Sequence, residues 1–254
     1  MTTISSMTAD TDYTLLSSRI QTWRGIGLRA QFLSRYDSPM LRALLTNPDD
    51  AFTEPAVELL KTDIKTTLCA TSFDGGRFVI KRYNIKNAWH RLRQAFRLSR
   101  AQNCWAFAQQ LADLGIATAP AVAWVQEYQV GLRGRSWFIC EHIENGARGD
   151  TLHDDADAEQ VEQVLQAVTR IFVLMRQNQL SHGDMKPPNI LLTPNQTVLL
   201  DLDAMRYHSS PVACERALAV DIARWVQWWR KDQPEPGISA RMRTLLQEAG
   251  FVVD

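Results

Sequence analysis

The sequence lacks the features that would place a protein in a membrane or direct it out of the cell. It contains no run of about 18 apolar residues, which is close to the length that a membrane-spanning helix needs. The first residues, Met1 to Asp12, are rich in Ser, Thr and Asp and have no apolar core like that of a signal peptide. We therefore expect neither a membrane-spanning segment nor a leader, and a loosely attached N-terminus.

Cysteine is scarce and shows no paired spacing. None of the four cysteines belongs to a C-x-x-C motif, and each has apolar neighbours; they are Cys69, Cys104, Cys140 and Cys214. The five histidines show no spacing typical of metal ligands. These observations predict reduced thiols in the core of a cytosolic protein, and they argue against a disulfide framework or a zinc site.

Acidic residues are absent from one long segment, although the chain as a whole is neutral, with 28 basic and 28 acidic residues. No Asp or Glu occurs between Gly75 and Ala112. We call six cations of this segment the basic stripe: Arg82, Lys86, Arg91, Arg93, Arg97 and Arg100. A local stripe on a neutral chain favours a specific anionic partner and no general binding of nucleic acid. A solvated helical face is the alternative.

Periodicity predicts an α+β protein whose strands come first. Residues 13–50 show helical patterns such as 38–45, interrupted at Asn47-Pro48. Five strands are predicted over residues 57–61, 67–73, 77–83, 120–128 and 135–143, and Asp74-Gly75-Gly76 indicates a hairpin turn. One helix is expected from Ser99 to Leu114.

After Asn145-Gly146, which we interpret as a hinge, the predicted elements are mostly helical. A long helix over 157–177 precedes two short strands, and helices near 212–231 and 239–249 follow. We therefore divide the chain into an N-terminal extension (1–55), a small β-rich lobe with one main helix (56–144) and a mostly helical lobe (145–254). This order of elements is that of the bilobal protein-kinase-like fold.

The most informative motif runs from His182 through Leu192 and is followed by an apolar run ending in Asp201. Asp184 precedes Asn189 by five residues, which is the spacing of a kinase catalytic loop. Asp184 would accept the proton of the attacking hydroxyl and Lys186 would neutralise charge on the transferred group. Asn189 and Asp201 would hold Mg²⁺ on the phosphates of ATP. The alternative is a proline-containing turn whose acids merely face water.

The first lobe supplies the predicted contacts to the nucleotide. Lys81 ends the strand after the hairpin, where kinases carry a phosphate-binding lysine, and we expect Lys65 and Glu141 also to contact the nucleotide. Two features of kinases are missing. The turn over 61–67 has no glycine, and the acid-free segment offers no glutamate to pair with Lys81.

The segment after Asp201 favours a small or glycan acceptor over a peptide. Only 19 residues separate Asp201 from Asp221, and there is no A-P-E motif. Asp203, which replaces the glycine of D-F-G, is expected to cap the turn, and an approach to the metal is the alternative. Asp221 opens a helical pattern and either accepts the backbone amides of the catalytic loop or stabilises the helix N-terminus.

Several stretches together resemble the lipopolysaccharide core kinases, the heptose and Kdo kinase family of Gram-negative bacteria. The resemblance covers about residues 57–225 and rests on residues 78–84, 98–101 with Trp105, 114–120, 182–189 and 200–206. Where such proteins often carry Glu before the tryptophan, this chain has Cys104.

The resemblance implies ATP-dependent phosphorylation of a sugar hydroxyl in the lipopolysaccharide inner core. The protein would be cytoplasmic, with peripheral contact at the inner face of the cytoplasmic membrane, and the basic stripe would meet the anionic glycolipid. Two alternatives stay open. One is a degenerate pseudokinase that binds nucleotide or a partner, and the other is a kinase for a soluble small molecule or a protein side chain.

Overall fold

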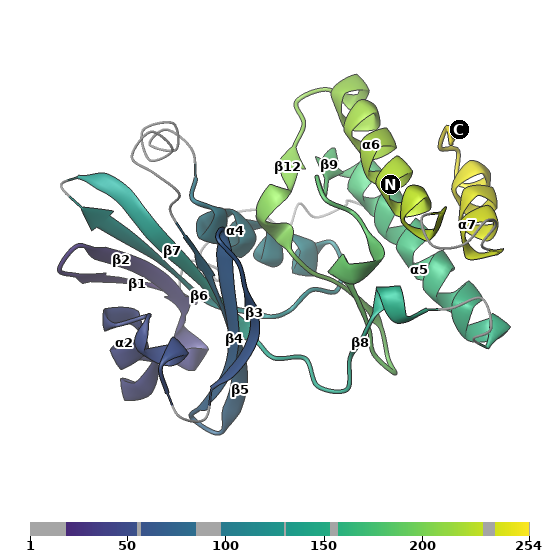
Figure 1. Ribbon diagram of the computed structural model, residues 1–254. Helices are drawn as coiled ribbons and strands as arrows, with labels where there is room; N and C mark the ends of the chain where they lie inside the picture. The colour runs from purple at the N-terminus through teal and green to yellow at the C-terminus, as the bar shows by residue number, and fades with distance from the viewer. Residues whose placement is uncertain are drawn as a thin grey trace, which may run out of the picture. The chain divides into compact units, whose positions relative to one another are not determined.

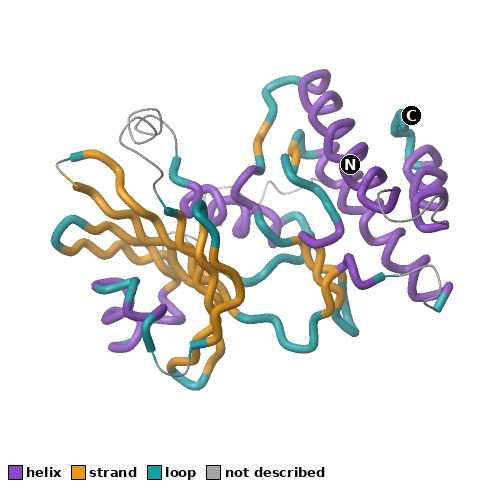
Figure 2. Tube along the Cα trace, viewed as in Figure 1, coloured by secondary structure: helices purple, strands orange, loops and turns teal. Residues whose placement is uncertain are grey.

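The computed structural model describes residues 19–54, 57–84, 98–129, 131–152, 157–230 and 237–253. Two compact units divide the chain. The first contains residues 1–105 and 121–142, and the second contains residues 106–120 and 143–254. Strands form most of the first unit and helices most of the second (Figure 2). The predicted N-terminal extension therefore belongs to the same unit as the β-rich lobe.

The first unit is built on a seven-stranded antiparallel sheet in the order β1-β2-β6-β7-β5-β4-β3 (Figure 1). The strands are β1 (Ile20–Gly25), β2 (Leu28–Leu33), β3 (Glu58–Thr62), β4 (Thr66–Phe73), β5 (Gly76–Tyr83), β6 (Ala121–Gln129) and β7 (Leu132–Glu141). Asp74 and Gly75 adopt positive φ angles of 50° and 75° between β4 and β5. Two such residues make the turn whose twist suits an antiparallel hairpin, as predicted.

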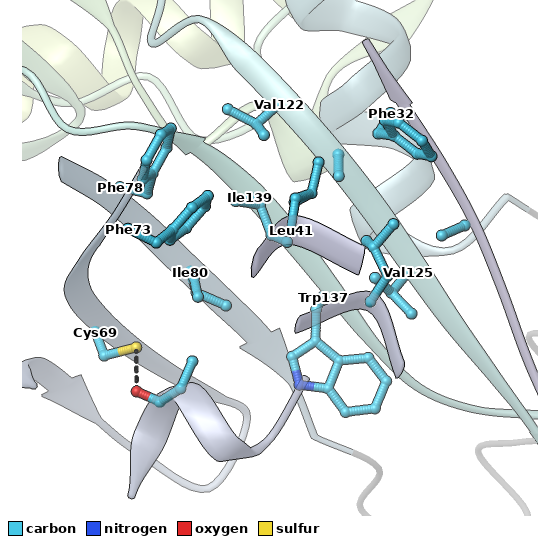
Figure 3. Packing of buried hydrophobic residues seen from close by; sticks show 14 residues of the cluster. Phe32, Leu41, Cys69, Phe73, Phe78, Ile80, Val122, Val125, Trp137 and Ile139 are labelled. Carbon is cyan, nitrogen blue, oxygen red and sulfur yellow. Dashed lines mark hydrogen bonds between the residues drawn. The ribbon is translucent and has the colours of Figure 1, made fainter. Parts of the chain in front are cut away.

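One face of the sheet is covered by the part of the extension that follows β2, residues 36–52. Helix α2 (Pro39–Thr46) begins at Ser38, whose hydroxyl accepts a hydrogen bond from the Leu41 amide, and it ends at Asn47, where the sequence predicted an interruption. Its Leu41 and Leu45 are fully buried. They pack with alternate residues of the sheet strands, including Phe78, Ile80, Val125, Trp137 and Ile139 (Figure 3). This apolar cluster is the core of the first unit.

The sequence-based expectation for residues 20–33 was wrong. Helical patterns were predicted there, but these residues form β1 and β2. β2 pairs with β6 from Leu28↔Glu127 to Phe32↔Ala123. Its Ala30 and Phe32 point into the apolar cluster. The partner strand lies about a hundred residues further along the chain, so local periodicity alone carried little information about it.

The other face of the sheet carries the N-terminal part of α4 (Arg100–Asp113), which crosses from the first unit into the second. Ser99 and Gln102 form a reciprocal cap: the Gln102 amide donates to the Ser99 hydroxyl at 3.3 Å, and the Ser99 amide donates to the Gln102 side chain at 3.0 Å. This capping box explains why the helix begins where it was predicted. Gly115 follows the helix with φ 71°, a conformation that favours glycine.

The second unit combines three long helices with short strands. The helices are α5 (Ala158–Gln177), α6 (Pro211–Arg230) and α7 (Gly237–Glu248); the strands are β8 (Ala147–Arg148), β9 (Leu180–Ser181), β10 (Ile190–Leu192), β11 (Thr197–Leu199) and β12 (Arg206–Tyr207). Helix α5 packs against α6 and α7 (Figure 1). Phe172 of α5 and Met242 of α7 are fully buried. β11-β10-β8 and β12-β9 form two small sheets beside these helices.

All four cysteines are buried and free, as predicted. Burial raises the pKa of Cys69 to about 11 and that of Cys140 to about 12, so both stay protonated thiols near neutral pH. No helix within the described residues is long and apolar enough to cross a membrane.

Candidate active site

The segment between β9 and β10 is anchored to α6 by one buried carboxylate. The Asp221 side chain is only 1% exposed. It accepts hydrogen bonds from the backbone amides of His182 at 2.8 Å, Gly183 at 2.9 Å and Met185 at 3.3 Å. Three amides directed at one carboxylate balance the cost of burying its charge. Asp221 therefore has the loop-anchoring role that was one of its two predicted roles.

His182 ties the start of this loop to its end. The imidazole is fully buried, its Nε2 lies 2.9 Å from the Leu200 carbonyl oxygen, and its Nδ1 lies 3.3 Å from the Asp184 amide. Since the carbonyl can only accept and the amide can only donate, these two contacts match the tautomer with its proton on Nε2. Leu200 also donates from its amide to the Asn189 carbonyl at 2.8 Å.

Gly183 is required by its backbone. Its φ of 80° lies in the left-handed region, and a Cβ at this position would meet the Ala204 carbonyl oxygen at 2.6 Å. Any side chain would therefore force apart the loop and the short 3-10 helix over Leu202–Ala204. The glycine allows the segments that carry Asp184 and Asp201 to approach closely.

Asp184 stands at the centre of a polar cluster. Its Oδ2 accepts a hydrogen bond from the Lys186 ammonium at 2.6 Å and lies 3.3 Å from the Asn189 Nδ2. The Arg224 Nε lies 3.7 Å from the other oxygen, Oδ1. Within the described ranges Oδ1 accepts no hydrogen bond, and the Asp184 side chain is 35% exposed. A half-exposed carboxylate with one open oxygen suits a group that accepts a proton from an incoming hydroxyl.

Asn189 and Asp201 provide oxygens of the kind that Mg²⁺ binds. The Asn189 amide nitrogen donates to the Asp184 carbonyl at 2.8 Å, which leaves its Oδ1 without a hydrogen-bond partner among the described residues. Asp201 directly follows the anchored Leu200 and adopts φ 60°. One carboxylate and one amide oxygen fit magnesium, which usually takes few protein ligands and completes its shell with water and phosphate.

Lys81 lies in β5 on the sheet face opposite the apolar cluster. Its Nζ is 5.1 Å from the centre of the Tyr83 ring, and it pairs in register with Phe138. The buried Tyr83 hydroxyl lies 3.1 Å from the Cys104 Sγ of α4. Cys104 therefore contacts Tyr83, the aromatic ring beside Lys81. The lipopolysaccharide core kinases that the sequence resembles often carry Glu at this helix position.

In the turn that contains Lys65, backbone amides donate hydrogen bonds to the Asp63 carboxylate. Asp63 Oδ1 accepts hydrogen bonds from the amides of Lys65 and Thr66, both at 2.7 Å. The nearby Lys61 ammonium and these amides hold the pKa of Asp63 well below its usual range. Two backbone amides of this turn therefore donate to the Asp63 carboxylate and are not free to bind a phosphate. A nucleotide contact of Lys65 stays a prediction.

Glu141 lies at the end of β7, on the face that the extension covers. Its Oε1 accepts a hydrogen bond from the Tyr36 hydroxyl at 2.5 Å. Burial, together with this bond to the carboxylate, raises the pKa of Tyr36 to about 12. The Glu141 side chain is therefore committed to a residue of the extension, and its predicted contact with the nucleotide stays a prediction.

Most of the basic stripe lies outside the described residues, namely Lys86, Arg91, Arg93 and Arg97. The two described members contact the protein itself. Arg82 Nη1 lies 3.2 Å from Asp49 Oδ1, and its guanidinium stacks on Phe52. Arg100 lies 4.5 Å from the centre of the Tyr83 ring. Both described arginines thus contact residues of the first unit, and a contact of the basic stripe with a glycolipid stays a prediction.

The second unit thus brings together the predicted Asp184, Lys186 and Asn189, with Asp201 one residue beyond the anchored Leu200. Lys81, Lys65 and Glu141 lie in the first unit. A model of the lipopolysaccharide kinase (Kdo/WaaP) family matches residues 61–224. The chain belongs to this family.

The matched region contains every predicted site residue. Membership of this kinase family supports the assignment of the chain as a phosphotransferase. A solved structure, WaaP in complex with acyl carrier protein, has the same fold with a TM-score of 0.60. It shares 15% sequence identity over 84% of this chain and 87% of that chain. The fold is accordingly protein-kinase-like, as predicted. No curated protein matches the chain.

Sequence analysis missed three residues of these clusters. Arg224 lies one helical turn after Asp221, and this i, i+3 spacing of opposite charges was a usable signal. Asp63, in a turn without glycine, could have been recognised as a residue that caps its own turn amides. Tyr36 carried no comparable signal, because its partner Glu141 lies 105 residues away in sequence.

Proposed function

We propose that this family member transfers the γ-phosphoryl group of ATP to a sugar hydroxyl, of heptose or Kdo type, in the lipopolysaccharide inner core. One observation carries the proposal: the Asp184 carboxylate is fixed through Oδ2 by Lys186 and Asn189, whereas Oδ1 is open to a hydroxyl. As the new O–P bond forms and the bond to ADP breaks, the hydroxyl proton passes to Oδ1.

The other loop residues have distinct roles in this proposal. Lys186 orients Asp184 and offsets negative charge on the transferred group. Asn189 and Asp201 would hold Mg²⁺, which supplies charge neutralisation on the phosphates. Lys81 would bind phosphate oxygens of the nucleotide. Asp221 and His182 keep the loop in shape through buried hydrogen bonds.

Phosphate transfer to purified lipopolysaccharide core tests the proposal, with the product located by mass spectrometry. The protein is incubated with ATP and magnesium and, in parallel, with soluble sugars or a peptide mixture as acceptors. A mass increase of one phosphate on an inner-core sugar is expected. Transfer to soluble sugars or peptides alone would favour the alternative acceptor class.

The pseudokinase alternative rests on the first unit. Lys81 lies beside an aromatic ring, and the turn amides serve Asp63 in place of a phosphate. Nucleotide binding without turnover toward any acceptor would support this alternative. Turnover that depends on magnesium would exclude it, because a pure binding module consumes no ATP.

We propose a cytoplasmic protein with peripheral contact at the inner face of the cytoplasmic membrane, where the acceptor glycolipid is made. Reversing the charge of Arg91, Arg93 and Arg97 together should then weaken sedimentation with anionic vesicles, by on the order of a hundredfold at low salt. Added salt should reduce the difference. Equal binding of both proteins at low salt would remove the stripe from the membrane contact.

An acyl carrier protein is a further proposed partner, because the similar WaaP structure was solved with one. Co-elution of the two purified proteins in gel filtration would support this partner. Separate elution at micromolar concentration would argue against a stable complex.

A further inference from the structure

Arg224 is a cation beside Asp184 that the reaction described above does not use. It projects from α6 and donates from Nη1 to the Gly183 carbonyl at 2.9 Å. The same nitrogen lies 3.4 Å from Asp221 Oδ1, so the guanidinium group is held against the anchored loop. A guanidinium with two fixed contacts loses little further freedom when it binds a third group.

Arg224 has two further nitrogens, Nε and Nη2, beyond the one that holds the loop. Nε lies 3.7 Å from Asp184 Oδ1, too far for a good hydrogen bond but close enough for charge attraction. Nη2 has no hydrogen-bond partner in the part of the chain that the structure describes, and the side chain is 38% exposed. A charged donor is therefore available to solvent beside the oxygen that would receive the acceptor hydroxyl.

The chemistry of this donor suits an anion. Asp184 accepts a hydrogen bond from the Lys186 ammonium at 2.6 Å, and the Asp221 carboxylate accepts three from backbone amides. The Arg224 guanidinium lies 3.4 Å from Asp221 Oδ1 and 3.7 Å from Asp184 Oδ1, so both carboxylates attract it, and Nη2 is the nitrogen left for a further oxygen. Guanidinium groups stay protonated at all ordinary pH values, and their planar donors match carboxylate and phosphate oxygens.

We propose that Arg224 is a specificity-determining residue that binds an anionic group of the acceptor next to the hydroxyl that is phosphorylated. The group is a carboxylate or a phosphate, and the acceptor is therefore an acidic glycan. This inference rests on the proposed kinase function and adds to it the residue that recognises the charge of the acceptor.

The experiment compares acceptors that differ only in charge. Lipid-free inner-core oligosaccharide is used in three forms: native, with its carboxylates reduced to alcohols, and with its phosphates removed. For each form, kcat/KM is measured with ATP, and binding without nucleotide is measured by titration calorimetry. The proteins are wild type, Arg224→Met, Arg224→Lys and the control Arg216→Met, which removes an exposed arginine of the same helix.

Wild type should prefer the native form, and the modification that weakens its use identifies the group as carboxylate or phosphate. Arg224→Met should lower the preference for the native form by about tenfold or more, through KM. Arg224→Lys should restore part of it, since charge is kept and the planar donors are lost. Arg216→Met should match wild type.

Two results would overturn the inference. Wild type that binds and uses all three forms equally has no anion-selective contact, whatever the variants do. Equal loss for all three forms in Arg224→Met would assign the residue to holding the loop. Failure of the proposed function is distinguishable, because phosphate transfer would then be absent for wild type while the calorimetric preference and its loss in Arg224→Met could still be measured.

Discussion

The loop of residues 182–189 in the second unit and the turn around Asp63 in the first unit share one structural feature in different settings. In both, an aspartate accepts hydrogen bonds from backbone amides: Asp221 from three amides of the loop, and Asp63 from two amides of its own turn. Asp221 is buried and links distant segments, whereas Asp63 is partly exposed and its contacts are local. The geometry of the loop is thus fixed by a contact with a distant helix, whereas the geometry of the turn is fixed by residues next to it in the sequence.

The two units also differ in how much of the kinase sequence pattern they contain. In the loop, Asp184, Lys186 and Asn189 lie within hydrogen-bonding distance of one another, and Asp221 holds the backbone. The turn over 61–67 in the first unit has no glycine, and Cys104 stands where the resembling kinases often carry Glu. The kinase pattern is therefore more complete in the loop than in the turn and helix of the first unit.

The largest predicted effect compares the two aspartates directly. Asp221→Ala leaves three backbone amides without their buried acceptor and should lower the free energy of unfolding by about 4 kcal/mol. Asp63→Ala, whose amides can turn to water, should cost much less. Urea unfolding at pH 7 measures both, with Glu215→Ala as an exposed control on α6. Similar losses for the two aspartates would refute the contrast.

The next effect concerns magnesium. Asp201→Ala should weaken nucleotide binding in the presence of magnesium by on the order of a hundredfold, because a carboxylate ligand of the metal is lost. Without magnesium, the variant and wild type should bind alike. Fluorescence titration with a labelled nucleotide is suitable, and Asp203→Ala, which we expect to affect only the turn, is the control. Magnesium-dependent binding that survives Asp201→Ala would remove this residue from the metal site.

A smaller effect is expected from the lysines of the first unit. Lys81→Met should raise the KM for ATP by about tenfold, the loss of one charge-assisted contact with phosphate. Lys65→Met should change it less, since the amides of its turn already serve Asp63. If Lys65→Met proves the more harmful of the two, the nucleotide is gripped from the turn and Lys81 is a structural residue.

The smallest effect comes from the partly exposed pair between α5 and α7, where the Arg241 guanidinium donates to the Glu162 carboxylate at 2.6 and 2.7 Å. Arg241 lowers the pKa of Glu162 from 4.5 to about 2. Because the folded pKa is depressed, the stabilisation is present above about pH 4.5 and is lost as the pH falls toward 2.

Glu162→Gln should therefore lower the free energy of unfolding by less than about 1 kcal/mol at pH 7, as for exposed ion pairs, and by nothing near pH 2. Thermal unfolding as a function of pH measures the difference, with Glu159→Gln as the control on the same helix. An equal loss at both pH values would mean that the charge of Glu162 is not what stabilises the helices.

Much of the fold could be predicted because its signals are local. The Asp74-Gly75 turn, the Ser99 cap and the helix that begins after Asp157 are specified by residues within one turn of each element. The loop from His182 to Asn189 was predictable because its chemistry fixes both residue types and spacing.

The rest depends on contacts between distant residues. Strands β1 and β2 form because β6 offers a partner, and residues 20–33 alone do not reveal that partner. The Tyr83–Cys104 contact joins a strand to a helix across the acid-free segment. The position of Arg224 beside Asp184 could not be predicted without knowing that Asp221 anchors the loop that carries Asp184.

The central claim is that Asp184 accepts the proton of an acceptor hydroxyl in a functioning kinase. The most direct test measures the rate of γ-phosphate transfer from ATP to lipopolysaccharide core by wild type and by Asp184→Asn, with nucleotide affinity determined for both. We expect transfer by wild type, a reduction of about a thousandfold in the variant, and little change in nucleotide affinity. Equal transfer rates for the two proteins would contradict it.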